Sequence, residues 1–159
     1  MSLSQFPDPT KAPLCALAFD YGTQRIGVAF GQSISGTAQA VRLLKANDGI
    51  PNWDEIGALI TQWRPDIFVV GLPYNMDGSD SDLLRRATKF ANRLNGRFNL
   101  PSYGMDERLS SREARSQVAE TNDRALKGTK KRAANDQPID HIAAQIILEN
   151  WFSAWRESI

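Results

Sequence analysis

Three acidic residues stand at the ends of predicted elements. Asp20 closes an apolar run, Glu107 follows a second run, and Asp140 lies at the start of the last predicted helix. Each position has an ordinary explanation, since strand ends commonly reach water and Asp140 would complement the dipole of its helix. The set is more informative, because sites in open α/β sheets form beyond the carboxyl ends of the strands. Helical spacing places Asp140 on the same side as Ile147, facing the sheet.

Three converging carboxylates repel one another and are tolerated when a cation lies between them. Carboxylate oxygens suit Mg²⁺ or Mn²⁺, and Mg²⁺ commonly takes few protein ligands together with substrate phosphates. One or two such ions support phosphodiester hydrolysis, because the metal lowers the pKa of its own water and no histidine base is needed. The pattern therefore predicts a metal-dependent nuclease with Asp20, Glu107 and Asp140 as catalytic residues and metal ligands.

The predicted order of elements can bring these acids together. The apolar patterns predict strands at 14–20, 25–31, 37–45, 66–72 and 100–105. They predict helices from about residue 52 to 63, 80 to 95, 110 to 119 and 138 to 155, with 120–136 as a mobile segment. Three strands without intervening helices, followed by alternating helices and strands, favour an α/β fold with a mixed sheet flanked by helices.

Length and composition limit the class of protein. The chain has 159 residues, a net charge of +1 and one cysteine, so we expect one domain without a disulfide. We expect residues 1–12 to form a flexible leader and residues 13–159 to form the domain. No apolar stretch approaches the roughly 18 residues of a membrane span, and the start lacks the pattern of a signal peptide. We therefore expect a cytoplasmic protein with no membrane partner.

Basic and amide side chains near the three acids are candidates for binding nucleic acid. The segment 121–136 has five basic and two acidic residues and leads directly to Asp140. It could grip a polyanion or be a solvated linker. Arg25, Arg108 and Arg112 follow the first turn and Glu107 and could hold phosphates, and Asn75 offers an amide to a phosphate or a base edge. The candidates in the basic segment are Lys127, Lys130, Lys131 and Arg132.

Five segments resemble the YqgF family, also called RuvX-like proteins. They are LAFDYGTQRIGVAFG at 17–31, VVGLPYNMDG at 69–78, KFANRL at 89–94, DERLSSREA at 106–114 and IDHIAAQIILENWF at 139–152. The resemblance implies a ribonuclease H-like domain with a five-stranded sheet of order 3-2-1-4-5. It also implies a cytoplasmic bacterial protein that acts on structured nucleic acid, with 5′-end processing of the small-subunit ribosomal RNA precursor (pre-16S rRNA) as the assigned role in ribosome biogenesis.

The resemblance places the family's catalytic acids on Asp20, Glu107 and Asp140. Asp106 adjoins Glu107 but should point to the opposite face of a strand, so it ranks as the reserve. The chain departs from the family pattern after the third acid, where a small residue is common and His141 stands instead. His141 could line the rim of the site or lie on the helix surface.

Three other functions are compatible with parts of the pattern. A Holliday junction resolvase of the same fold would cut branched DNA and would need a dimer for paired cuts. No obligate dimer surface is evident in the sequence, which favours a monomer or weak homodimer. A non-catalytic nucleic-acid-binding factor in assembly of the small ribosomal subunit would not need the acids. A kinase with an actin-like fold would need two domains, and the chain has the length of one.

Overall fold

The computed structural model of the chain describes residues 6–74, 77, 81–107 and 138–158, the last range with side chains from residue 142 onward. The helix predicted at 110–119 and the segment 120–136 lie outside these residues. None of the described helices is both long and apolar enough to cross a membrane.

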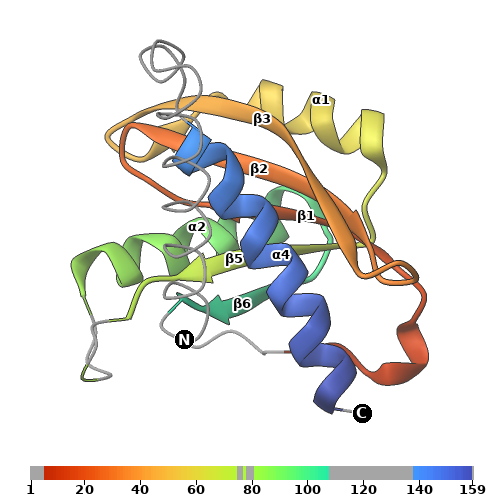
Figure 1. Cartoon of the computed structure of the whole chain (residues 1–159). Coiled ribbons are helices and arrows are strands. Elements are labelled where there is room, and N and C mark those ends of the chain that lie inside the picture. Colours follow the sequence, from red (N-terminus) through yellow and green to blue (C-terminus); the bar gives the residue numbers. More distant parts are fainter. Residues whose placement is uncertain (1–5, 75–76, 78–80, 108–137, 159) are drawn as a thin grey trace, which may run out of the picture.

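A mixed sheet forms the centre of the described chain (Figure 1). Its order is β4-β3-β2-β1-β5-β6, so the predicted order appears in five neighbouring strands. β1 pairs with β2 and β2 with β3 in antiparallel fashion, whereas β1–β5 and β5–β6 are parallel. The strands are β1 (Cys15–Asp20), β2 (Arg25–Gln32), β3 (Thr37–Asn47), β4 (Ile50–Pro51), β5 (Ile67–Leu72) and β6 (Ser102–Asp106).

The sheet has six strands, and the prediction of five was wrong because it missed β4. This two-residue strand pairs with the end of β3, with Asn47 opposite Ile50. Asp48 and Gly49 connect them with φ values of 51° and 84°. Two successive residues of positive φ match the right-handed twist of a tight hairpin, and Asp-Gly is a strong sequence signal for that turn. The signal was present in the sequence, but the following strand is too short to show alternation.

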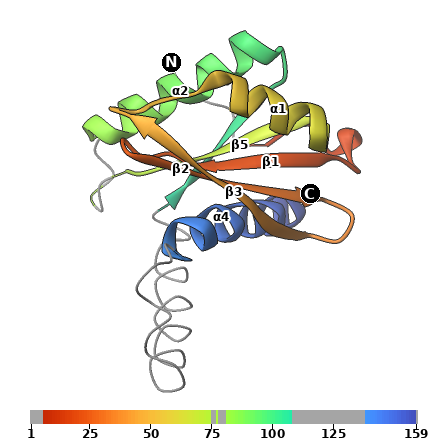
Figure 2. The same cartoon turned by 90° about the horizontal axis from the view of Figure 1, so that it is seen from above.

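Helices cover both faces of the sheet (Figure 2). α1 (Trp53–Trp63) and α2 (Asp82–Phe98) lie on one face, and α4 (Pro138–Ser158) lies on the other. Side chains alternate along β1, so Leu17 and Phe19 join the core under α1 and α2, while Ala16 and Ala18 join the core under α4. The small alanines let α4 approach β1 closely, and its Trp151 is fully buried there.

The N-terminal residues, which the sequence predicted to be a flexible leader as far as residue 12, contact α4. The ring of Phe6 lies 5.9 Å from that of Trp151, measured between centroids. The indole Nε1 of Trp155 donates a hydrogen bond of 3.2 Å to the carbonyl oxygen of Pro7. Residues Pro9–Lys11 then form a short 3₁₀ helix that Asp8 caps.

Ser81 fixes the start of α2 at the edge of the sheet where β5 ends. Its Oγ accepts a hydrogen bond from the Leu84 N–H at 2.9 Å and donates one to the Pro73 carbonyl at 3.0 Å. Replacing an N-cap serine by alanine removes the acceptor of a helix-terminal N–H. We predict that Ser81→Ala lowers the free energy of unfolding by about 1 kcal/mol in urea denaturation. Ser81→Thr keeps both hydrogen bonds and serves as the control, and equal stability of all three proteins would contradict this role.

Candidate active site

Asp20 is the last residue of the central strand, and its side chain points to the face that α4 covers. Ala16 and Ala18 belong to the core beneath α4, and alternation along β1 places Asp20 on the same face. The side chain is partly buried. A run of four fully buried residues precedes it, so the packing of β1 fixes where this carboxyl emerges.

The structure brings Glu107 to Asp20. Met105 packs in the core beneath α4, and Glu107, two residues further, lies on the same face just after β6. Its side chain forms a hydrogen bond with the side chain of Asp20. Two of the three acids that the sequence singled out therefore meet at one edge of the sheet.

Gly71 makes the space for this pair. It lies on β5, between β1 and β6, and pairs with Met105. A Cβ added at Gly71 would lie 2.8 Å from Oε1 of Glu107 and 2.8 Å from Cδ1 of Ile147, closer than a Cβ normally approaches other heavy atoms. On the other side of β1, Gly27 is the partner of Asp20. Because both flanking strands have glycine here, neither places a side chain beside the Asp20 carboxyl at these positions.

The pKa of Glu107 is raised above its ordinary value of 4.5. Burial of the carboxyl group is the main cause, the nearby charge of Asp106 adds to it, and the hydrogen bond with Asp20 acts in the opposite direction. A low-dielectric environment disfavours an ionised carboxyl, and a second carboxylate disfavours it further. The pair is therefore poised to hold a proton or a cation.

Asp106 lies on the opposite face from Glu107. It pairs with Leu72 of β5, which belongs to the core beneath α1 and α2. Partners in neighbouring parallel strands point to the same face, so Asp106 is directed away from α4. This direction agrees with the strand alternation that the sequence predicts for Asp106 and Glu107.

Asp140 lies in the first turn of α4, because that helix begins at Pro138. In both views the first turn of α4 lies toward the end of the sheet at which β5 and β6 end (Figures 1 and 2). The backbone thus places the third acid at the same edge, while its side chain and that of His141 lie outside the described residues. Among the described residues, no group of three or more acidic, histidine or cysteine side chains is placed to hold a metal ion.

Two basic residues flank this edge on the face of α4. Arg25 begins β2, and Lys45 is its partner on β3. Both are exposed. Their neighbours Ile26 and Leu44 point into the core beneath α1 and α2, so Arg25 and Lys45 point the other way. The sequence singled out Arg25 as a candidate but not Lys45, because only the register across strands brings Lys45 to this end of the sheet. The other candidates, Asn75, Arg108, Arg112, Lys127, Lys130, Lys131 and Arg132, lie outside the described residues.

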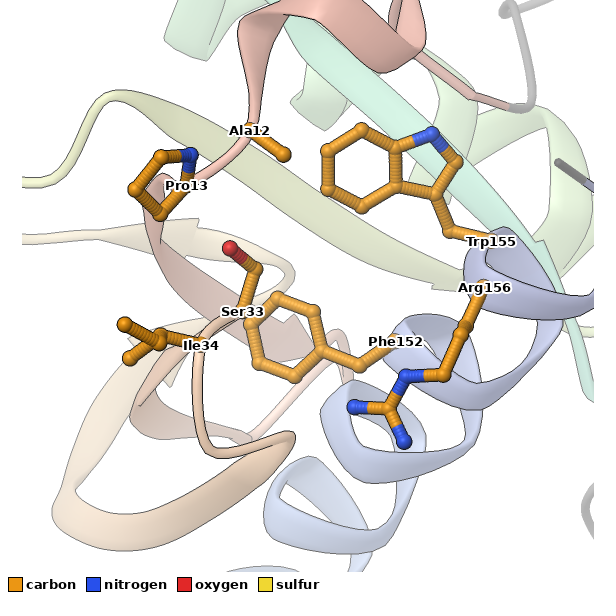
Figure 3. A pocket seen from close by; sticks show the side chains of 7 residues that line it. All are labelled: Ala12, Pro13, Ser33, Ile34, Phe152, Trp155 and Arg156. Atoms are coloured by element: carbon orange, nitrogen blue, oxygen red, sulfur yellow. The ribbon is translucent and has the colours of Figure 1, made fainter.

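An apolar hollow of about 380 Å³ lies at the opposite edge of the sheet (Figure 3). Pro13, Ile34, Phe152 and Trp155 line it, with Arg156 at its border. These residues follow β2 or precede β1 and occupy the C-terminal end of α4, far along the strands from Asp20. The described lining of this hollow has no acidic side chain, so the hollow is unsuited to the chemistry of the carboxyl pair.

Known proteins of similar sequence share nearly the whole chain. A protein of Glaesserella parasuis named "Putative pre-16S rRNA nuclease" is 56% identical over 137 residues, which cover 86% of this chain and 94% of that protein. A protein of Pseudomonas fluorescens with the same name is 51% identical over 138 residues, covering 87% and 91%.

Solved structures of similar fold come from resolvases. The RuvC of Thermus thermophilus in complex with a Holliday junction substrate has a TM-score of 0.53 at 14% identity, covering 91% of this chain and 97% of that one. A second structure of T. thermophilus RuvC has a TM-score of 0.52 at 13% identity, covering 90% and 96%. At this identity the likeness concerns the fold, and it confirms the predicted ribonuclease H-like α/β architecture.

The family model described as "RuvX: Holliday junction resolvase" matches residues 14–154. That span runs from the first strand through almost all of α4 and includes Asp20, Glu107 and Asp140. The resemblance found in the sequence motifs is thereby confirmed, and the chain belongs to the RuvX family.

Proposed function

We propose that this protein is a divalent-metal-dependent nuclease that cleaves the precursor of small-subunit ribosomal RNA in the cytoplasm. The hydrogen-bonded pair of Asp20 and Glu107 at the carboxyl ends of parallel strands carries the proposal. Nuclease activity fits the family description and the names of the relatives. The choice of ribosomal RNA over a DNA junction rests on the relatives' names alone.

The described residues suit a hard cation. Carboxylate oxygens are the ligands that Mg²⁺ and Mn²⁺ prefer. Glycines at 27 and 71 leave room beside the pair, and the pKa of Glu107 is raised, as expected of a buried carboxyl that a bound cation would stabilise in its ionised form. Asp20 and Glu107 would hold the metal, and Asp140 would complete the set from the first turn of α4.

The bound metal would supply activation of water and neutralisation of charge at the scissile phosphate. The chain itself fixes two carboxyl groups on rigid strand ends, so that little reorganisation is needed when substrate arrives. Arg25 and Lys45 stand at the same edge and would offset the charge of the phosphates that flank the scissile bond.

We predict that Asp20→Asn lowers the rate of RNA cleavage on the order of a thousandfold, as removal of a catalytic group does. The measurement uses purified protein, Mg²⁺ or Mn²⁺, a labelled 5′-extended ribosomal RNA precursor and, in parallel, a four-way DNA junction. Asp66→Asn is the matched control, because Asp66 is exposed at the opposite end of the sheet, where it accepts a hydrogen bond from the Cys15 N–H.

The two substrates separate the competing functions. Cleavage of the RNA alone, lost in Asp20→Asn and retained in Asp66→Asn, supports ribosomal processing. Cleavage of the junction alone would identify a resolvase. Binding of RNA without cleavage by the wild type, in the presence of precursor ribosomal particles, would replace the nuclease with a non-catalytic assembly factor.

Glu107 gives a second prediction, from the pH dependence of stability without metal. A carboxyl whose pKa is raised in the folded protein binds protons more readily there than in the unfolded chain. Its contribution therefore stabilises the fold at low pH and is lost as pH rises from 4.5, the ordinary pKa of the group, through the folded pKa. Glu107→Gln removes this loss of stability, because it replaces the carboxyl group with a neutral amide that can donate a hydrogen bond to Asp20. We predict that in EDTA at neutral pH the variant unfolds about 3 °C above the wild type, which corresponds to roughly 1 kcal/mol.

Bound metal should make the wild type more stable than Glu107→Gln, the reverse of the order expected in EDTA. A ligand that binds only the folded state at 100 times its Kd stabilises by about 2.7 kcal/mol. Adding Mn²⁺ is therefore expected to raise the Tm of the wild type and to leave that of Glu107→Gln nearly unchanged. Glu157→Gln, an exposed exchange near the end of α4, should behave as the wild type. An equal response to Mn²⁺ in all three proteins would place the metal elsewhere.

A further inference from the structure

α2 carries a concentrated positive charge on the face of the molecule opposite α4. Its 17 residues include five basic residues and one acidic residue, a net charge of +4 in a chain whose total is +1. Four of the basic residues follow one another at spacings of three, four and four, which places them on one side of the helix. They are Arg86, Lys89, Arg93 and Arg97.

This side of α2 borders a groove of about 210 Å³. The turn between β3 and β4 forms one wall, α2 forms the other, and Tyr21, Trp53 and Phe90 contribute aromatic rings. Lys89 and Arg93 also line the groove, on the side that α2 forms. Among the described residues, no carboxylate forms an ion pair with Lys89, Arg93 or Arg97.

The structure holds the two ends of the basic row in place. Arg86 donates to the carboxylate of Asp48 at 3.1 Å and to its backbone carbonyl at 3.3 Å. The guanidinium carbon of Arg97 lies 4.4 Å from the centroid of the Trp53 ring. Holding the guanidinium of Arg97 against an aromatic face reduces the entropy lost when it binds an anion, whereas Arg86 is already paired with the Asp48 carboxylate.

The groove begins beside the candidate active site. Tyr21 lines it and directly follows Asp20 in the chain. Its hydroxyl donates to the Gly49 carbonyl at 3.1 Å, which ties the end of β1 to the turn that forms the wall. From Arg86 to Arg97 the helix rises about 16 Å, a length that spans several phosphates of a nucleic acid strand.

We propose that this groove binds the phosphodiester backbone of the RNA strand that flanks the cleavage site. The proposal rests on the proposed nuclease function and adds a second binding surface to it. Lys89 and Arg93 would each pair with a phosphate, and Arg86 and Arg97 would extend the surface on either side. A substrate that crosses the sheet edge at Asp20 then touches both faces of the sheet.

A polynucleotide fits the groove better than an acidic protein segment does. The four cations form one row along a helix, which matches the regular repeat of a phosphate backbone. Apart from Ile50, which is 57% exposed, the described lining offers few exposed apolar side chains of the kind that protein interfaces bury at their centre.

The test measures binding of a labelled single-stranded RNA from the precursor 5′ end in EDTA, across a salt series, so that no cleavage occurs. The double variant K89Q/R93Q removes two charges from the groove. The matched control K11Q/R156Q removes two exposed charges near the apolar hollow at the opposite edge. Because the groove variant can no longer pair with two of the phosphates, we expect its Kd to rise about tenfold and its slope of log K against log salt to fall by about 1.4. The control should match the wild type.

Further readouts keep this inference separate from the nuclease itself. K89Q/R93Q should retain the rise in Tm with Mn²⁺ and the cleavage rate at saturating RNA, with the loss confined to KM. Equal RNA binding by all three proteins, with cleavage intact, would overturn the proposal that the groove binds RNA but would not affect the proposed nuclease function. Neither binding nor cleavage by the wild type would overturn both. Weaker binding of polyglutamate by the variant with unchanged RNA binding would make the groove a protein-docking surface and reject the proposal.

Discussion

The carboxyl groups of Asp20 and Glu107 lie within hydrogen-bond distance, where two ionised carboxylates repel each other strongly. A proton or a cation must therefore accompany the pair. The surrounding fold maintains this arrangement: β1 and β6 end at the same edge, and Gly71 between them provides space that any side chain would fill. In the metal-free protein the pKa of Glu107 is raised mainly because its carboxyl group is buried, and the charge of Asp106 adds to this effect. A bound cation would favour the ionised carboxyl and would relieve the repulsion within the pair.

The two faces of the sheet carry different parts of the proposed site. The face beneath α4 holds the carboxyl pair, and its core of small and aromatic residues sets how closely α4 approaches. The opposite face packs α1 and α2 on a larger apolar core and leaves the basic side of α2 in solvent. Residues 20 and 21 link the two faces, because consecutive side chains in a strand point to opposite faces. Asp20 joins the carboxyl pair, and Tyr21 lines the basic groove.

Much of this arrangement could be predicted from the sequence because it depends on local patterns. The apolar runs before Asp20 and Glu107 were enough to expect both carboxyls beyond the carboxyl ends of parallel strands in a mixed sheet. The roles of Gly71 and Lys45 could not be predicted, since they depend on the register of strands distant in sequence. The basic side of α2 was visible as a helical spacing, but its groove exists only because the turn at Asp48 and Gly49 packs opposite it. The Asp-Gly pair in that turn is a strong local signal for a hairpin, and the short strand that follows it was not predicted.

The proposed nuclease chemistry requires the metal to bind at the pair formed by Asp20 and Glu107. Crystals of the protein grown with Mn²⁺ and measured for anomalous scattering test this directly, because Mn²⁺ is located independently of the protein atoms. We predict an anomalous peak at coordination distance from both carboxyl groups, with Asp140 completing the ligand set. An absence of density there in crystals of a preparation that cleaves RNA with Mn²⁺, or a peak at Asp106 on the opposite face, would contradict the assignment.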